Sequence, residues 1–267
     1  MEKLISFVIP NWNHKVLLGE CLSSILSSKG ALNKQVIVVD NASSDGSYAY
    51  VKQIFGNRVE WIQNKKNEGY ARAVNKGVAL ASGELIFLLN NDVKLYTDTV
   101  RNLVLYLEGR SQAGAVSPLL YYPNGELQIS CRRFPTPSAL LLQQFNIGRC
   151  GPYKKWKLTP MEHLSGSRVV MQPMASALLI RRHCWFQVGP MDESFPIFFN
   201  DVDWCYRLYT ATNYKIYLCT WARAMHHEGA SVNRLGFRKK IEFYKGLYRF
   251  YRKHYIGKKV RSGLKGV

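Results

Sequence analysis

The sequence predicts an α/β protein with a mostly parallel central sheet and helices on both faces. Two observations support this class. Short, continuously apolar runs alternate with segments whose apolar residues recur at helical spacing, and several of the apolar runs end in clusters of polar residues. Strands that are apolar along their whole length belong to sheets that helices cover on both faces, which is the arrangement of parallel sheets.

The elements of the first half follow from these patterns. The first run, Ile-Ser-Phe-Val-Ile, is β-branched and aromatic and is closed by Pro10, so it is a strand. Similar runs predict the later strands, and apolar positions three and four residues apart predict the helices. The expected strands are residues 5–9, 35–39, 59–62 and 85–89, and the expected helices are residues 16–28, 70–81 and 97–107, with a turn and helix cap at 43–47.

The second half has a weaker pattern. Residues 118–173 are rich in Pro, Gly and Tyr and show no clear period, so they are expected to form long connections over a site or against a partner. Order is expected to return at residues 175–181 and 189–203, followed by a helix over residues 202–212.

Polar residues cluster where three of the expected strands end. Asn11 and Asn13 follow the first strand, Asp40 and Asn41 follow the second, and residues 90–92 (Asn-Asn-Asp) follow the fourth. In open α/β sheets, ligands bind outside the carboxyl ends of the strands. The pattern therefore predicts a binding site at this edge of the sheet.

Two segments carry carboxylates that suit catalysis. Asp92 follows a buried strand, where it can hold Mg²⁺ or Mn²⁺ against a diphosphate or can simply close a turn. Asp201 and Asp203 flank an apolar residue at the start of an expected helix. One of them can cap the helix while the other acts as a general base, and both can also serve only to favour the helix N-terminus.

Two further segments have both a functional and a structural interpretation. His226 and His227 stand before a Glu-Gly turn, and neutral imidazole is a ligand for Mn²⁺-type metals. Asn67, Gly69 and Arg72 open a helix, which suits a diphosphate but also fits an ordinary glycine turn with a solvated arginine. No P-loop and no G-x-G-x-x-G motif is present, which excludes a classical NTPase and a classical dinucleotide-binding protein.

Composition narrows the partners. The chain has 37 Lys and Arg against 18 Asp and Glu, a net charge of +19, which indicates an anionic partner such as nucleotide phosphates or an acidic membrane surface. No apolar run approaches the ~20 residues of a membrane span, and the N-terminus lacks a signal-peptide pattern, so a cytoplasmic location is expected. No RRM, KH or helix-turn-helix signature occurs, so no nucleic-acid partner is expected.

The motifs occur in a specific order along the chain: Val-Ile-Pro-Asn-Trp-Asn (8–13), Val-Val-Asp-Asn-Ala-Ser-Ser-Asp-Gly-Ser (38–47), Asn-Glu-Gly-Tyr-Ala-Arg (67–72), Leu-Asn-Asn-Asp (89–92), Asn-Asp-Val-Asp (200–203) and His-His-Glu-Gly (226–229). This order resembles the family 2 glycosyltransferases, and the nearest branch is the rhamnosyltransferase-type enzymes of bacterial cell-surface polysaccharide synthesis. The resemblance implies a GT-A fold over residues 1–233, followed by a basic, aromatic helical tail over residues 234–267.

The resemblance also implies an activity: inverting transfer of a sugar, with a deoxyhexose such as rhamnose as one candidate, from a nucleoside-diphosphate sugar to a saccharide or lipid-linked acceptor. Mn²⁺ or Mg²⁺ is the implied cofactor. The implied catalytic base is Asp201, and the implied metal ligands are Asp92 and His226. The implied nucleotide-sugar ligands are Pro10, Asn11, Asn13, Asp40, Asn41, Asn67, Gly69, Arg72, Asn90 and Asn91.

The sequence departs from the family pattern at particular positions. Asn200 replaces the glutamate before the base, Asn90 begins the D-x-D motif, and Gly-Pro-Met-Asp (189–192) replaces Gly-Gly-Phe-Asp. These changes keep open an inactive, sugar-nucleotide-binding relative. A nucleotidyltransferase is a second alternative, but it needs a glycine-rich basic loop where residues 10–14 read Pro-Asn-Trp-Asn-His.

The basic tail has two interpretations. Residues 234–267 contain 12 Lys and Arg and one acidic residue, and apolar residues recur there at helical steps, at positions 237, 241, 244, 248, 251 and 255. Such a helix can pack on the catalytic domain. It can also lie on an anionic membrane leaflet and so attach the enzyme peripherally to the inner face of the cell membrane.

Overall fold

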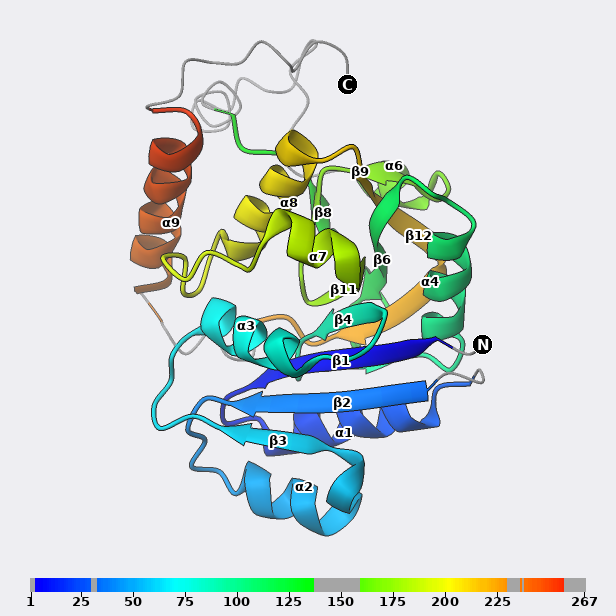
Figure 1. The fold of residues 1–267 in the computed structure, drawn as a ribbon, viewed down its shortest axis with the longest axis vertical. Coiled ribbons are helices and arrows are strands. Elements are labelled where there is room, and N and C mark those ends of the chain that lie inside the picture. Colours follow the sequence, from blue (N-terminus) through cyan, green and yellow to red (C-terminus); the bar gives the residue numbers. More distant parts are fainter. Residues whose placement is uncertain (1–2, 30–32, 137–158, 230–235, 237, 257–267) are drawn as a thin grey trace.

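The computed structural model describes residues 3–29, 33–136, 159–229, 236 and 238–256. The first half of the chain builds a parallel block of strands in the order β3-β2-β1-β4, which confirms the four predicted strands (Figure 1). Their register brings Asn11 opposite Asp40, and Asp40 opposite Gln63. The strands are β1 (Leu4–Asn11), β2 (Asn33–Asp40), β3 (Glu60–Gln63) and β4 (Leu85–Leu89).

The sheet continues with strands that make it mixed. β11 (Ala177–Arg181) pairs antiparallel with both β4 and β6 (Ala113–Tyr121). β12 (Lys215–His226) then pairs parallel with β6 and antiparallel with β5 (Val93–Leu95). The sequence patterns did not predict β6 or β12, because β6 contains Gly114 and Pro118, which are uncommon in strands, and β12 is interrupted by a register shift.

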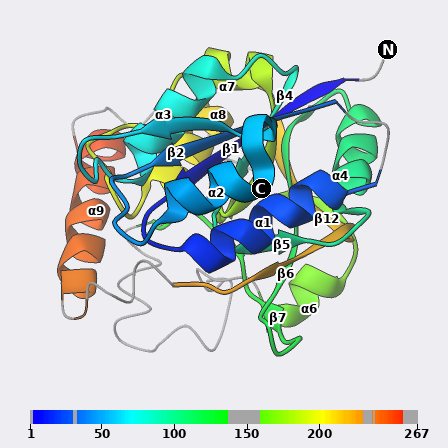
Figure 2. The same cartoon turned by 90° about the horizontal axis from the view of Figure 1, so that it is seen from below.

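Helices cover both faces of the sheet, as Figures 1 and 2 show. α1 (Lys15–Ser27), α2 (Ser47–Phe55) and α4 (Thr99–Glu108) pack on one face and share an apolar core with Phe7, Phe87 and their neighbours. α3 (Tyr70–Leu80), α7 (Arg182–Val188) and α8 (Asn200–Ala211) pack on the other face with Val8 and Leu88. The predicted helices are present, α8 begins two residues before the predicted start, and α7 was not predicted.

The segment expected to be irregular contains short elements instead. Besides the end of β6 it holds β7 (Leu127–Gln128), β8 (Cys131–Arg132), α6 (Pro160–Leu164), β9 (Arg168–Val170) and β10 (Gln172–Pro173), while residues 137–158 lie outside the described residues. β7 and β9 pair with β6 and β12, so long-range pairing supplies the order that local periodicity lacks. A short 3₁₀ helix, Gly56–Arg58, precedes β3.

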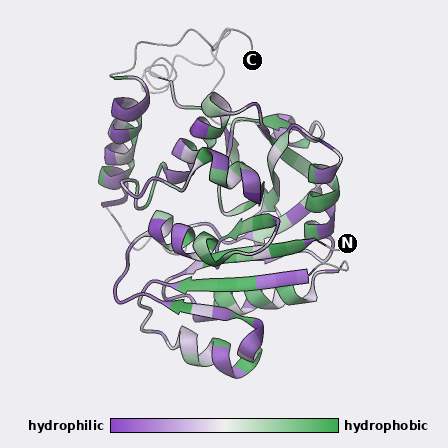
Figure 3. Cartoon of the chain, in the orientation of Figure 1, coloured by the Kyte–Doolittle hydropathy of each residue, from purple (hydrophilic) through white to green (hydrophobic). Residues whose placement is uncertain are grey.

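The basic tail forms a helix, α9 (Arg238–His254), that packs on the segment leading into α8. Phe250 and His254 are buried there, and Gly246 lies so close that a Cβ atom at this position would be 2.8 Å from the ring of Phe199. In Figure 3 most of α9 is coloured as hydrophilic, and its exposed residues include Ile241, Tyr244 and Tyr248. The predicted boundary between residues 233 and 234 lies outside the described residues.

The apolar residues that recur at helical steps along the tail are therefore divided between two surfaces. Phe243 and Leu247 lean on the core around Phe199, whereas Ile241, Tyr244 and Tyr248 are exposed. Among the described residues, no helix is long and apolar enough to cross a membrane.

Candidate active site

One cleft gathers most of the predicted site residues. It has a volume of about 1130 Å³ and lies where the carboxyl ends of β1, β2 and β4 meet the segment before α8 and the first turns of α9. The predicted residues that line it are Pro10, Asn11, Asn41, Asn67, Gly69, Asn90, Asn91, Asp92, Asp201 and His226. The edge predicted from the strand ends is thus the edge at which the cleft is found.

A buried amide network fixes the three strand ends relative to one another. The side chain of Asn91 donates to Oδ1 of Asn11 at 2.7 Å, and the side chain of Asn11 donates to Oδ1 of Asp40 at 2.7 Å. Asp40 also accepts from the Ser43 backbone and from the side chain of Gln63, each at 2.8 Å. Because buried polar groups are costly unless they are paired, this network makes the floor of the cleft rigid.

Gly69 lies on the wall of the cleft, where α3 meets the segment before α8. It has a φ of +86°, and a Cβ atom here would lie 2.8 Å from the carbonyl oxygen of Pro196. The next residue, Tyr70, donates its backbone N–H to that carbonyl at 2.9 Å. Both the backbone conformation and the close approach require glycine, so this residue sets the contact between α3 and the segment before α8.

Asp92 and His226 meet through the long-range pairing of β12. A register shift between Cys219 and Arg223 bends the end of β12 toward β5, where His226 pairs with Val93. Nε2 of His226 then lies 3.3 Å from Oδ1 of Asp92, and both side chains are almost fully buried. Burial opposes ionisation of Asp92, but the hydrogen bond and positive charge of His226 outweigh it and lower the pKa of the carboxyl.

A relay of side chains orients the imidazole ring of His226. The Gln128 amide donates from Nε2 to Oε2 of Glu228 at 2.9 Å, and Tyr122 donates to the same oxygen at 2.6 Å. The carbonyl end of Gln128 therefore faces Nδ1 of His226, at 2.8 Å. A carbonyl oxygen only accepts, so Nδ1 carries a proton, and Nε2 is the ring nitrogen that faces Asp92.

This arrangement fits a divalent cation. A lone pair on His226 and a carboxylate oxygen on Asp92 repel each other unless a positive charge stands at Nε2 or between them. Oδ1 of Asp92 has no partner other than this ring nitrogen, and the buried Oδ1 of Asn90 has no hydrogen-bond partner among the described residues. Carboxylate and amide oxygens with one imidazole form a donor set suited to Mn²⁺ or Mg²⁺.

Asp201 lies in the first turn of α8 and faces the cleft. Its Oδ1 accepts from the backbone of Val202 at 2.8 Å, and its Oδ2 accepts from Gln172 at 3.3 Å. Burial raises the pKa of Asp201, although the positive charge of Arg132 and backbone N–H groups oppose this shift. A carboxylate whose proton affinity is raised is better matched to accepting a proton than an exposed aspartate.

Tyr70 is linked to Asp201 through the backbone of Ala175. Its hydroxyl donates to the carbonyl of Ala175 at 3.0 Å, and the Ala175 backbone N–H lies 3.5 Å from Oδ2 of Asp201. Burial, together with the charges of Asp201 and Asp92, raises the pKa of the Tyr70 phenol. Both carboxylates line the same cleft as Tyr70.

Asp203 faces away from the cleft and has a different set of partners. It binds Arg207 at 2.9 Å, His254 at 2.7 Å and Lys253 at 2.8 Å. Burial alone opposes its charge, but the hydrogen bonds from His254 and Lys253 and the charge of Arg207 lower its pKa. Asp203 is thus the acid that anchors α9, which corrects the expectation that it could replace Asp201 as a base.

Three of the predicted nucleotide-sugar ligands do not line the cleft. Asp40 is buried behind Asn11, where its oxygens already accept several hydrogen bonds. Asn13 accepts from the backbone of Ser44 at 2.8 Å. Arg72 is turned outward and forms an ion pair with Glu193 at 2.7 Å, so its placement gives no support for diphosphate binding.

Several residues of the site had no signal in the sequence. Gln128 lies on the two-residue strand β7, and Gln172 lies on β10, inside the segment without periodicity. Arg132 also lines the cleft. Asn200, which replaces the glutamate of the family pattern, is buried, and its side chain donates to the carbonyls of Phe195 and Ile197. Its Oδ1 accepts from the backbone of Asp201, so it shapes the turn that presents the carboxylate.

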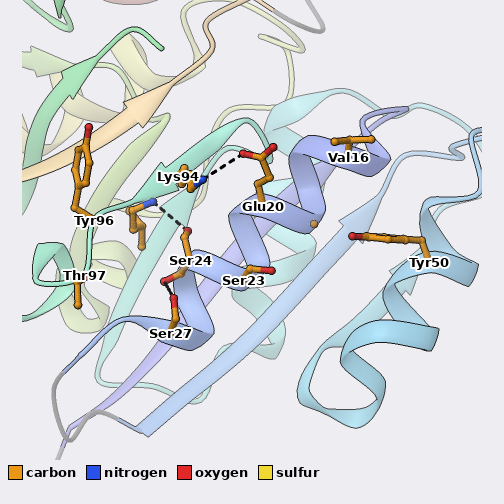
Figure 4. Close-up of a pocket in the computed structure, with 11 residues that line it drawn as sticks. Val16, Glu20, Ser23, Ser24, Ser27, Tyr50, Lys94, Tyr96 and Thr97 are labelled. Carbon is orange, nitrogen blue, oxygen red and sulfur yellow. Dashed lines mark hydrogen bonds and ion pairs between the residues drawn. The ribbon is translucent and has the colours of Figure 1, made fainter. Parts of the chain in front are cut away.

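A second hollow, of about 480 Å³, lies between α1, α2 and the β5 region (Figure 4). It contains none of the predicted site residues. Its polar groups bind one another, since Lys94 pairs with Glu20 at 3.6 Å and Ser24 accepts from the backbone of Leu95 at 3.0 Å. The larger cleft is therefore the candidate site.

Comparison with known proteins identifies the family. The sequence model of glycosyl transferase family 2 matches residues 6–164, which is more than half of the chain. The chain belongs to glycosyl transferase family 2.

Solved structures support the GT-A fold of this family 2 member. GalNAc-T7 with UDP, GalNAc and Mn²⁺ has a TM-score of 0.65 at 18% identity, covering 84% of this chain and 43% of that one. A mannosyltransferase from Pyrobaculum calidifontis in complex with GDP-Man and Mn²⁺ has a TM-score of 0.66 at 16% identity, covering 94% and 65%.

Curated relatives of this family 2 member include enzymes of glycan synthesis. The N-acetylglucosaminyl-diphospho-decaprenol L-rhamnosyltransferase of Mycobacterium tuberculosis is 29% identical, over 74% of this chain and 68% of the relative. The low-salt glycan biosynthesis hexosyltransferase Agl10 of Haloferax volcanii is 24% identical, over 75% and 61%. An uncharacterized protein, y4gI of Sinorhizobium fredii, is 28% identical over 91% of this chain, which spans only 27% of that relative.

The orientation of His226 leads to a first prediction. Replacing Gln128 by alanine removes the acceptor that fixes the imidazole ring, and loss of such outer contacts typically weakens metal binding by about 10–100-fold. Titration with Mn²⁺ by calorimetry should therefore show this loss in Gln128→Ala. The exposed Gln112→Ala serves as the control and should bind Mn²⁺ normally; equal affinity in both variants would show that the relay does not orient His226.

Proposed function

We propose that this family 2 member is an inverting glycosyltransferase that moves a sugar from a nucleoside-diphosphate sugar to a saccharide or lipid-linked acceptor in polysaccharide synthesis. One observation carries the proposal. A single cleft holds the Asp92–His226 pair, suited to a divalent cation, and Asp201, suited to accept a proton. The similarity to a rhamnosyltransferase supports a deoxyhexose such as rhamnose as the first donor sugar to test.

The residues of the cleft divide the work in the proposed reaction. The strand-end amides of Asn11, Asn41 and Asn91 hold the nucleotide side, and Asp92 and His226 would hold Mn²⁺ or Mg²⁺. Such a cation supplies neutralisation of the negative charge on the departing diphosphate. Asp201 accepts the proton of the acceptor hydroxyl as that oxygen attacks the anomeric carbon. One in-line attack inverts the configuration, so a single carboxylate is sufficient for the proton.

The binding part of the proposal can be tested without turnover. Calorimetry with UDP, GDP and dTDP should show tighter binding of at least one nucleotide with Mn²⁺ than with a chelator. Asp92→Ala should abolish that difference, as should Asp92→Asn, which keeps the size of the buried side chain. Exposed Asp98→Asn is the control and should behave as the unaltered chain. If affinity is the same with metal and with chelator, the site is metal-independent.

If Asp201 is the general base, its replacement by asparagine should lower the activity without lowering the stability. The raised pKa of Asp201 means that the folded protein favours the protonated form, so its contribution to stability is present at low pH and is lost as pH rises through the raised pKa. At neutral pH the ionised carboxylate is therefore unfavourable. Asp201→Asn should leave the Tm unchanged or raise it, while transfer falls by ~10²–10⁴, the usual contribution of a general base.

The reaction products of the unaltered protein and the activity of Asp201→Asn separate the alternative functions. Turnover of unaltered protein should release a nucleoside diphosphate, and pyrophosphate would indicate a nucleotidyltransferase instead. Absence of turnover with every donor, despite nucleotide binding, would indicate an inactive relative. Near-normal transfer by folded Asp201→Asn would place the base elsewhere. The rate of unaltered enzyme should also fall on acidification, at a pH above the ordinary aspartate pKa of ~3.9.

We propose in addition that the outer face of α9 attaches the enzyme peripherally to an anionic membrane surface. Ile241 and Tyr248 are exposed there, beside the exposed cations Lys245 and Arg252. Exposed aromatic side chains among cations are typical of interfacial helices, and each surface cation adds ~1 kcal/mol near an anionic leaflet.

Vesicle co-sedimentation tests this attachment. Binding should rise with the fraction of anionic lipid, fall with salt, and weaken in the double variant Tyr248→Ser/Arg252→Gln. The matched control is Tyr48→Ser/Arg58→Gln, which alters similar side chains far along the chain from α9. Equal partitioning to neutral and anionic vesicles would leave α9 with a packing role only.

A further inference from the structure

We propose that Gln172 is a positioning residue for the base: its side-chain amide holds Oδ2 of Asp201 and thereby leaves Oδ1 to take the proton of the acceptor hydroxyl. This inference rests on the proposed function and adds to it a positioning residue and the oxygen that reacts. Gln172 is fully buried on β10 and is not among the residues that line the cleft. It therefore acts on the reaction only through Asp201.

The position of Gln172 is set by the two-stranded sheet of β8 and β10. In this antiparallel pair Gln172 lies opposite Arg132. α6 holds β8 in turn, because Nε2 of His163 accepts from the backbone N–H of Cys131 at 3.1 Å. Nδ1 of His163 lies 3.1 Å from the carbonyl of Thr159 and so carries the proton, and burial lowers the pKa of the ring, so Nε2 remains an acceptor. Gln172 therefore has a fixed support beside the first turn of α8.

The amide of Gln172 is oriented by its contact with Asp201. Nε2 donates to the carbonyl of Pro173 and to Oδ2 of Asp201, each at 3.3 Å. Oε1 is buried and has no hydrogen-bond partner among the described residues. A carboxylate only accepts hydrogen bonds, so the amide nitrogen, and not the amide oxygen, must face Asp201. Leaving a buried amide oxygen unpaired is costly, which indicates that the contact with Asp201 decides how this side chain lies.

The hydrogen bonds to Asp201 are unequally divided between its two oxygens. Oδ2 accepts from Gln172 and lies 3.5 Å from the backbone nitrogen of Ala175. Oδ1 accepts from the backbone N–H of Val202 at 2.8 Å. Each carboxylate oxygen can accept two hydrogen bonds. Among the described residues, two other residues donate to Oδ2 and one donates to Oδ1, so Oδ1 is the oxygen that keeps a free lone pair.

Oδ1 is accordingly the atom that takes part in the proposed transfer. As the acceptor oxygen forms its bond to the anomeric carbon, the bond from that carbon to the diphosphate oxygen breaks, and its electron pair leaves on the nucleoside diphosphate. The hydroxyl proton moves to Oδ1 of Asp201. Burial raises the pKa of this carboxyl, and the hydrogen bond from Gln172 acts in the opposite direction because it is made to the charged form.

Other ionisable groups also act on Asp201. The positive charge of Arg132 opposes the raised pKa of Asp201. The Tyr70 phenol and the Cys205 thiol interact with Asp201 and are neutral, because burial raises the pKa of both. The cleft lining also holds the ionisable residues Glu68, Asp92, His226, Glu228, Lys239 and Lys240. All these groups are the same in variants of residue 172, so a difference between such variants comes from that residue.

Carbon NMR of the full chain with ¹³C-labelled aspartate follows the titration of Asp201, and Asp201→Asn assigns its signal. Gln172→Leu cannot donate, so we expect the titration to move to higher pH by about one pH unit, the loss of one hydrogen bond to a charged group. Gln172→Glu keeps the size of the side chain but places a second carboxyl beside the first, so we expect a larger move. Exposed Gln112→Leu is the control and should leave the titration unchanged.

Turnover separates positioning from packing. Release of nucleoside diphosphate is measured with dTDP-rhamnose, UDP-GalNAc and GDP-mannose, with water as the acceptor, because attacking water also gives a proton to the base. Gln172→Leu should lower the plateau of kcat by about 10–100-fold, since the carboxylate is no longer held in place. It should also move the acid limb of the kcat profile to higher pH and leave the donor KM unchanged. If Gln172 only filled space, Gln172→Glu would keep the acid limb of the unaltered protein.

An unmoved Asp201 titration in both Gln172→Leu and Gln172→Glu would overturn the inference, as would a normal plateau of kcat in Gln172→Leu. Gln172→Glu keeps the shape of the site, so its titration decides the question even if Gln172→Leu lowers the Tm. Failure of the proposed function is recognised separately, as absence of turnover by the unaltered protein. The NMR titration then still decides whether Gln172 holds Asp201.

Discussion

The carboxylate of Asp203 has no exposed surface and is bound by Arg207 on its own helix and by Lys253 and His254 on α9. Successive residues of a helix are about 100° apart, so Asp201 and Asp203 point in nearly opposite directions from α8. Anchoring Asp203 to α9 therefore turns Asp201 toward the cleft. The same contact holds the last turn of α9 against α8, whereas nearer the start of α9 Phe243 and Gly246 pack on Phe199.

This buried charge is favourable only while its partners remain. Breaking a buried ion pair by removing one member leaves an uncompensated charge, which is strongly destabilising. Because the pKa of Asp203 is lowered in the folded state, its contribution to stability is present above the ordinary aspartate pKa and is lost as pH falls through the lowered value. The close approach of Gly246 to Phe199 and the burial of Phe250 complete the same interface without charge.

Local sequence patterns predicted the parallel half of the sheet and the edge at which the cleft lies. β1, β2 and β4 contain apolar runs, and their polar ends are visible at Asn11, Asp40 and Asn91. The pairing of Asp92 with His226 could not be derived from local patterns, because it depends on a register shift in β12 that brings together residues 134 positions apart. Gln128 and Gln172 were also missed, because each lies on a two-residue strand, which is too short to show a period. Arg72 is predicted as a phosphate ligand from its place at a helix start, and the structure pairs it with Glu193 from a distant segment, which a local pattern does not indicate.

The dependence of α9 on Asp203 is tested most directly by hydrogen–deuterium exchange of the amides of α9 and of β1–β4 in two variants. In Asp203→Asn, the account predicts that α9 loses its protection while the sheet strands keep theirs. In Asp201→Asn, both should stay protected, because that side chain faces the cleft and does not anchor the helix. Unchanged protection of α9 in Asp203→Asn would contradict the account, since α9 would then be held without the ion cluster.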